Sequence, residues 1–82
     1  MQLFIKIFCG KTIVIDVGTH DTIFELKSKI IEKAQYAKAL QSGLILRLLK
    51  GVEVNNTQTI GELNIPKETT LYCHYRRRLN LN

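Results

Sequence analysis

The chain has 82 residues, of which 45% are hydrophobic and 23% are charged. This length fits one domain, and the composition is that of a folded protein rather than a disordered tail. No apolar run approaches the roughly 18 residues that a membrane span needs. The cysteines, Cys9 and Cys73, are too few for a disulfide scaffold or a four-cysteine zinc site. The start of the chain has no secretory signal pattern, so we expect a cytoplasmic or nuclear protein. We also expect no cofactor and no metal.

The net charge is +5, and it owes much to the consecutive residues Arg76, Arg77 and Arg78. A terminal arginine cluster is weak evidence for binding to nucleic acid or an anionic surface. A solvated basic segment explains the same charge, so composition alone does not separate these two interpretations.

The first 17 residues predict a β-hairpin. Residues 1–8 alternate, so that Leu3, Ile5 and Ile7 share the face opposite Lys6. Residues 9–11 form a turn around a glycine, and residues 12–17 alternate again.

A helix is predicted from Thr22 to about Leu40. Thr22 and Glu25 have the spacing of a capping box, which satisfies otherwise unpaired N–H groups. Gly43 is positioned as its C-cap. Apolar residues recur at helical spacing and form the expected core-facing stripe: Ile23, Leu26, Ile30, Ala34 and Ala37.

Three further strands are predicted, at residues 44–49, 52–54 and 70–76. Because Arg47 should face solvent, Leu46 and Leu48 point inward, and Ile45 and Leu49 outward. In the last strand the outward residues are Tyr72, His74 and Arg76. The predicted order is β-β-α-β-β-β, with the helix across one face of a mixed five-stranded sheet and the terminal strands parallel at its centre. This arrangement is an α+β β-grasp fold. Residues 1–77 form this domain, and residues 78–82 are a flexible C-terminal tail.

Nothing in the sequence indicates catalysis. Cys73 and His74 are neighbours in a strand and point to opposite faces, so they cannot form a dyad. Phosphate-binding glycine loops and paired carboxylates are also missing from the sequence. We therefore expect no catalytic residues and no metal ligands.

Several separated motifs, in the right order, resemble the ubiquitin family. They are M-Q-L-F-I-K at residue 1, G-K-T-I at residue 10, D-T-I followed by K-S-K-I, and T-I-G-E-L-N-I-P-K-E-T-T-L from residue 59. The resemblance covers the chain except residues 34–49 and the tail after Arg77. It implies the same β-grasp fold.

The resemblance also implies a partner-binding surface on the outer face of the sheet. Its apolar positions are Phe8, Leu49 (or Leu48), Tyr72 and His74, and the basic residues around them are Lys6, Arg47, Arg76 and Arg77. The lysines at positions that accept isopeptide bonds in the family are Lys6, Lys11, Lys27, Lys29, Lys33 and Lys67. The position most associated with degradative chains is Val52 here.

Three departures from the family pattern change the expectation. His74 stands where the family has an apolar residue of the partner-binding surface. No glycine follows Gly61, whereas conjugated members end in Gly-Gly, so this chain should not act as a covalent modifier. The connection at residues 37–43 is long and has no proline, where family members carry a glycine and a proline pair. We therefore predict a helix extended beyond the usual end.

These features favour a monomeric protein-interaction module that proteasome receptors, ligases or processing enzymes recognise noncovalently. Four apolar residues predicted on one face, Phe4, Phe8, Leu49 and Tyr72, favour a partner surface. The first alternative is an RNA-binding face, in which the aromatic rings stack bases beside Lys6, Arg47 and Arg76. The second is that the chain is the N-terminal targeting domain of a longer protein. A membrane partner is not expected.

Overall fold

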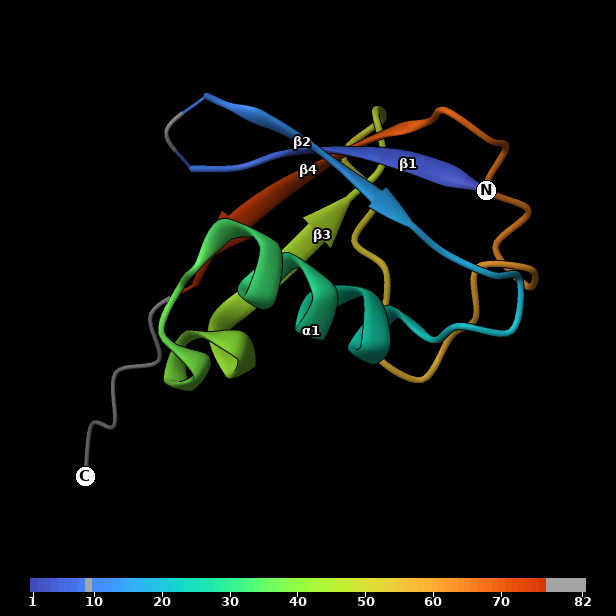
Figure 1. Ribbon diagram of the computed structural model, residues 1–82. Helices are drawn as coiled ribbons and strands as arrows, with labels where there is room; N and C mark the ends of the chain where they lie inside the picture. Colours follow the sequence, from blue (N-terminus) through green and yellow to red (C-terminus); the bar gives the residue numbers. More distant parts are fainter. Residues whose placement is uncertain (9, 77–82) are drawn as a thin grey trace.

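The computed structural model describes residues 1–8 and 10–76. Four strands and one α-helix are present in this part of the chain (Figure 1): β1 (Gln2–Lys6), β2 (Thr12–Asp16), α1 (Ile23–Ala34), β3 (Leu44–Arg47) and β4 (Thr70–Tyr75). A short 3₁₀ helix, η1 (Lys38–Gly43), lies between α1 and β3. The Cys9 thiol, Arg77 and the predicted tail at residues 78–82 lie outside the described residues.

The sheet has the order β2-β1-β4-β3, and α1 lies across one of its faces (Figure 1). β1 pairs antiparallel with β2 and parallel with β4, and β3 pairs antiparallel with β4. The parallel pair requires a long crossover, which contains α1. The predicted β-grasp fold, with the terminal strands side by side, is confirmed.

The sheet has four strands rather than the predicted five. Residues 52–54 run beside β3, but only Arg47 and Glu53 form an isolated bridge. Two backbone bonds hold the segment, from Leu48 N to the Val52 oxygen and from Val54 N to the Leu46 oxygen. The tight turn at Gly51 brings the chain back, and the segment then diverges from β3 toward Asn55 before a ladder can form.

The helix begins as predicted but ends six residues early. Thr22 and Glu25 form the capping box, with reciprocal bonds of 3.2 and 3.1 Å. The prediction of a helix to about Leu40 is wrong, because α1 ends at Ala34 and its C-cap is Gln35 in the left-handed conformation (φ 58°), not Gly43. This reversal brings Tyr36 and Leu40 back against the core, whereas a continued helix would carry them away from it.

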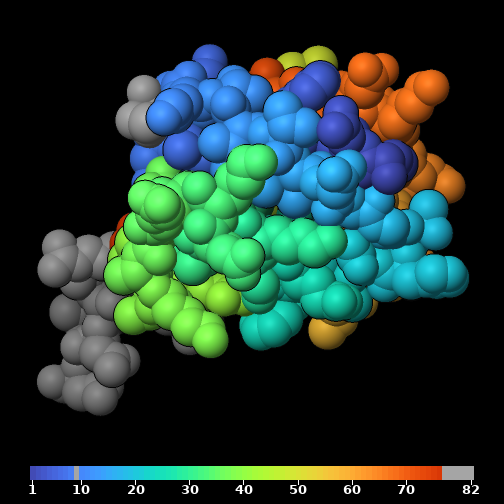
Figure 2. Space-filling view, in the orientation of Figure 1, coloured from blue at the N-terminus to red at the C-terminus, as the bar shows by residue number. Residues whose placement is uncertain are grey.

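The core lies between α1 and the inner face of the sheet. Its fully buried side chains come from every layer: Leu3, Ile5, Ile23, Leu26, Ile30, Leu46, Val54, Ile60 and Leu71. The alternating residues of β1 and the predicted stripe of α1 meet here, except that Ala34 is only partly buried and Ala37 is exposed. In the space-filling view, α1 and the segment after it (green) lie below the β1–β2 hairpin (blue) and cover the lower part of this side (Figure 2). Within the described residues, no helix has the length and apolarity to span a membrane.

Candidate protein-binding face

The outer face of the sheet carries a row of side chains that crosses three strands. The register places Lys6 of β1 beside Tyr72 of β4, and Tyr72 opposite Arg47 of β3. Two residues further along β4, His74 lies opposite Ile45. Because neighbouring residues in register share a face, Lys6, Tyr72 and Arg47 point to the side away from α1. The predicted outward orientation of these residues is confirmed.

The two leucines after β3 differ in burial, as the alternation predicted. Leu48 is partly buried and packs against the core, whereas Leu49 lies in the turn and its exposed fraction is 79%. Leu49 is therefore the leucine that a partner can reach. It does not occupy the strand position opposite Tyr72, because Arg47 fills that position.

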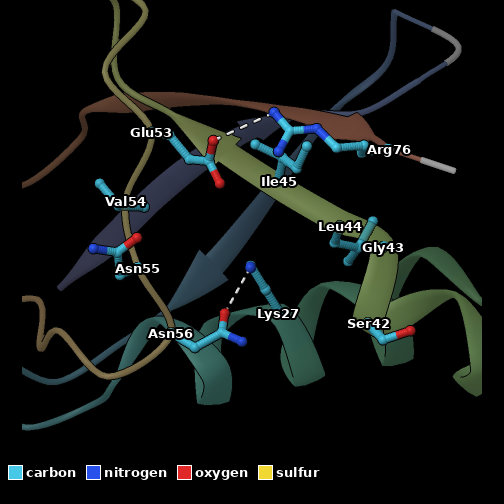
Figure 3. A pocket seen from close by; sticks show the side chains of 10 residues that line it. All are labelled: Lys27, Ser42, Gly43, Leu44, Ile45, Glu53, Val54, Asn55, Asn56 and Arg76. Atoms are coloured by element: carbon cyan, nitrogen blue, oxygen red, sulfur yellow. Dashed lines mark hydrogen bonds and ion pairs between the residues drawn. The ribbon is translucent and has the colours of Figure 1, made fainter. Parts of the chain in front are cut away.

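Ile45 departs from the expectation for an outward residue, since it is 7% exposed. It lines a cleft with Glu53 and Arg76, whose side chains form an ion pair at 3.5 Å (Figure 3). This end of the outer face is thus covered by charged groups and adds little apolar surface.

Phe8 lies beyond the end of β1 and is 44% exposed. Its ring stacks on Tyr36, with the centroids 5.0 Å apart and the planes at 9°, and meets the edge of Tyr75 at 6.2 Å. Tyr36 follows the C-cap of α1, and Tyr75 is the last residue of β4. Phe8 therefore stands at the rim of the sheet, with one ring face already occupied.

Two neighbouring hollows connect these residues. One, of about 500 Å³, is lined by Lys6, Phe8, Tyr72 and His74 among others. The second, of about 300 Å³, is lined by Arg47, Leu49 and again by Tyr72 and His74. We call the residues Phe8, Leu49, Tyr72 and His74, with Lys6, Arg47 and Arg76 around them, the outer-face patch. Phe4, the fourth apolar residue expected on this face, is partly buried.

Arg47 is the unusual member of the patch. It is partly exposed, yet its Nε atom is buried and has no hydrogen-bond partner among residues 1–8 and 10–76. Buried donors are normally paired, so this N–H carries a desolvation cost. Sequence reasoning placed Arg47 at the edge of the patch and missed its position between Tyr72 and the chain reversal at Gly51. The apolar run around it gave no signal of this.

Cys73 is a core residue and not a nucleophile. Its side chain is 4% exposed, and burial raises the pKa of the thiol to about 11, so the thiol stays protonated near neutral pH. His74 points to the opposite face and is exposed. Within the described residues, no three His, Cys, Asp or Glu side chains lie close enough together to hold a metal ion.

The lysines at the family's acceptor positions differ in accessibility. Those that are exposed are Lys6, Lys11, Lys29, Lys33 and Lys67. Lys29 forms an ion pair with Asp21 at 2.9 Å, and the Gly18 N–H and Lys29 together lower the pKa of the Asp21 carboxyl. Lys27 is 7% exposed and donates a 2.6 Å hydrogen bond to Asn56. As an acceptor, Lys27 would need a local opening of the fold.

A comparison with models of protein families agrees with the fold. Residues 3–78 match the model described as the ubiquitin family. The match includes the helix and all four strands except Gln2, the first residue of β1. Domains of this family are generally modifiers or interaction modules rather than enzymes, and this chain is a ubiquitin-like protein-interaction module. It belongs to the ubiquitin family.

Proposed function

We propose that this chain works by noncovalent recognition, and that proteins which bind the ubiquitin fold contact it through the outer-face patch. Such proteins include proteasome receptors, ligases and processing enzymes. The observation that supports this most is the pair of hollows that share Tyr72 and His74 and reach Phe8 on one side and Leu49 on the other. Exposed apolar side chains around a concave surface are typical of protein-binding sites.

The shape of the patch suits an amphipathic helix. A helix presents an apolar side chain about once per turn, at a spacing of roughly 5 Å, and can place successive side chains in adjoining hollows. The patch is small, so the interface would fall at the low end of interface sizes and the complex would exchange rapidly. The cations Lys6, Arg47 and Arg76 would orient the partner and raise the association rate. Arg77, which follows Arg76 in the sequence, would add to this effect.

An RNA-binding face is less well supported. Base stacking needs a free aromatic face, but Phe8 already stacks on Tyr36 and Phe4 is partly buried. Tyr72 alone would leave a weak platform. RNA binding would also fall steeply as salt is raised, because phosphate contacts release counterions.

The proposal is tested with a purified ubiquitin-binding helix from a proteasome receptor, titrated into the ¹⁵N-labelled chain and followed by NMR. We expect saturable shifts at Tyr72 and His74. Truncation of Leu49 to alanine removes a side chain whose full burial contributes about 1.5–3 kcal/mol, so Leu49→Ala should weaken binding about 10- to 100-fold. Phe8→Ala should weaken it by a similar factor.

Phe24→Ala is the matched control. Phe24 is also a large exposed apolar residue, at 54%, but it lies on α1, away from the outer face of the sheet. Its truncation should leave the affinity unchanged. Binding that survives in both Leu49→Ala and Phe8→Ala would exclude the patch. Incubation of the chain with activating enzyme and ATP should give no thioester, because no glycine follows Gly61.

A further inference from the structure

A second concave site lies at the edge of the sheet, where the start of β3 faces residues 53–56. Its volume is about 220 Å³ (Figure 3). The ammonium of Lys27 reaches it from α1, and Arg76 and Glu53 close the opposite side. A water molecule takes about 30 Å³ in the liquid, so the cleft has room for a small polar group.

Lys27 brings a buried positive charge into this cleft without a carboxylate partner. An ammonium has three N–H donors, and buried charges are normally paired. In the described part of the chain, the side chain of Lys27 donates one hydrogen bond, to the neutral Oδ1 of Asn56. The desolvation of Lys27 lowers its pKa, and the nearby charge of Glu53 opposes that effect.

Glu53 does not supply the missing partner. Its carboxylate is paired with Arg76 at 3.5 Å, and it forms no ion pair with Lys27 within residues 1–8 and 10–76. The charged side chains around the cleft are therefore two cations and one carboxylate. The unbalanced charge is positive, and it lies on the less accessible of the two cations.

Asn56 adds a donor next to this ammonium. Its Oδ1 accepts from Lys27, and its Nδ2 group makes no hydrogen bond in the described chain. The hydroxyl of Ser42 also lines the cleft. An ammonium and an amide N–H group on neighbouring side chains can each donate to an oxygen of one carboxylate.

We propose that the cleft binds a single carboxylate group of a protein or peptide, held by Lys27 and Asn56. The carboxylate is either an Asp or Glu side chain or a C-terminal α-carboxylate. This site shares Arg76 with the outer-face patch, but Lys27 and Asn56 line neither of the two hollows of that patch. The proposal therefore does not depend on the function proposed for the patch.

The test uses small probes and the whole chain, ¹⁵N-labelled, at constant ionic strength. N-acetyl-glutamic acid α-amide carries a side-chain carboxylate, N-acetyl-alanine carries an α-carboxylate, and N-acetyl-glutamine amide is the neutral control. We expect saturable shifts of the Gly43 and Asn56 amides with at least one carboxylate and none with the neutral probe. The probe that binds more tightly identifies the source of the carboxylate.

Asn56→Asp provides a matched variant, because aspartate has the shape of asparagine but places a carboxylate beside Lys27. This internal anion should compete with the ligand and weaken carboxylate binding at least tenfold while the fold is kept. The proposal is overturned if neither carboxylate shifts these amides more than sodium chloride does. Equal affinity in the wild-type chain and in Asn56→Asp would overturn it as well.

Discussion

Replacement of Arg47 by lysine removes one buried N–H group and keeps the positive charge. The Nε of Arg47 has no hydrogen-bond partner in residues 1–8 and 10–76. The corresponding atom of lysine is the Cε methylene, which needs none. The substitution therefore removes the unpaired donor, and an ammonium of the same charge takes the place of the guanidinium.

The expected gain follows from two terms. A buried donor without a partner costs about 1–3 kcal/mol, and a buried methylene contributes about 0.8 kcal/mol. The two side chains have similar rotamer entropy, so that term nearly cancels. Because Arg47 is only partly buried, we take the lower end and expect Arg47→Lys to raise the free energy of unfolding by about 1 kcal/mol.

Urea denaturation measures this change, and Arg76→Lys is the control. Arg76 lies on the same side of the sheet but is exposed and reaches Glu53 only at 3.5 Å. Its replacement should change the free energy of unfolding by less than about 0.5 kcal/mol. If Arg47→Lys is no more stable than the wild-type chain at an unchanged m-value, the Nε is satisfied in solution and the reasoning is refuted.

Two further predictions concern the end of α1 and the buried thiol. Gln35→Gly should raise the free energy of unfolding by about 0.5–1 kcal/mol, because glycine adopts a positive φ without strain. Lys33→Gly, inside the helix, should lower it by about 1 kcal/mol, and a loss in both variants would contradict the assignment of the helix end. Burial raises the pKa of Cys73 from 9.0 to about 11, so the unfolded chain loses this proton first and stability falls as pH rises through that window. The free energy of unfolding should fall by at most about 1.4 kcal/mol per pH unit. If a Cys73→Ala chain loses as much stability as the wild-type chain over the same pH range, the buried thiol is not the cause.

The parts of the fold that were predictable rest on local patterns that the core reinforces. The alternation in residues 1–8 and 12–17 puts Leu3, Ile5 and Ile15 on one face, where they are buried. The capping box at Thr22 fixes the start of α1 through bonds within four residues. In both cases the tertiary contacts agree with what short-range chemistry favours.

The end of α1 was not predictable because nothing local stops the helix there. Residues 35–42 contain neither glycine nor proline, and Ala34 and Ala37 continue the helical spacing. The chain reverses at Gln35, a residue that rarely adopts a left-handed conformation, since the reversal brings Tyr36 against Phe8 and Leu40 onto the core. Long-range packing offsets the local cost, and a single sequence does not display that balance.

The position of Arg47 opposite Tyr72 is also set by long-range contacts, and it bears more directly on the proposed function than the end of α1 does. The run from Leu44 to Leu49 is apolar except at Arg47, so alternation orients its residues but does not say which of them faces Tyr72. The ladder with β4 places the one charged residue of the run there. Because Lys6 lies beside Tyr72 on the other side, a row of two cations and a tyrosine divides the apolar surface between Phe8 and Leu49. A partner helix that contacts both must cross that row. A helix with a wholly apolar stripe would leave the Arg47 guanidinium desolvated and unpaired. The partner helix therefore needs a hydrogen-bond acceptor or a carboxylate at its centre.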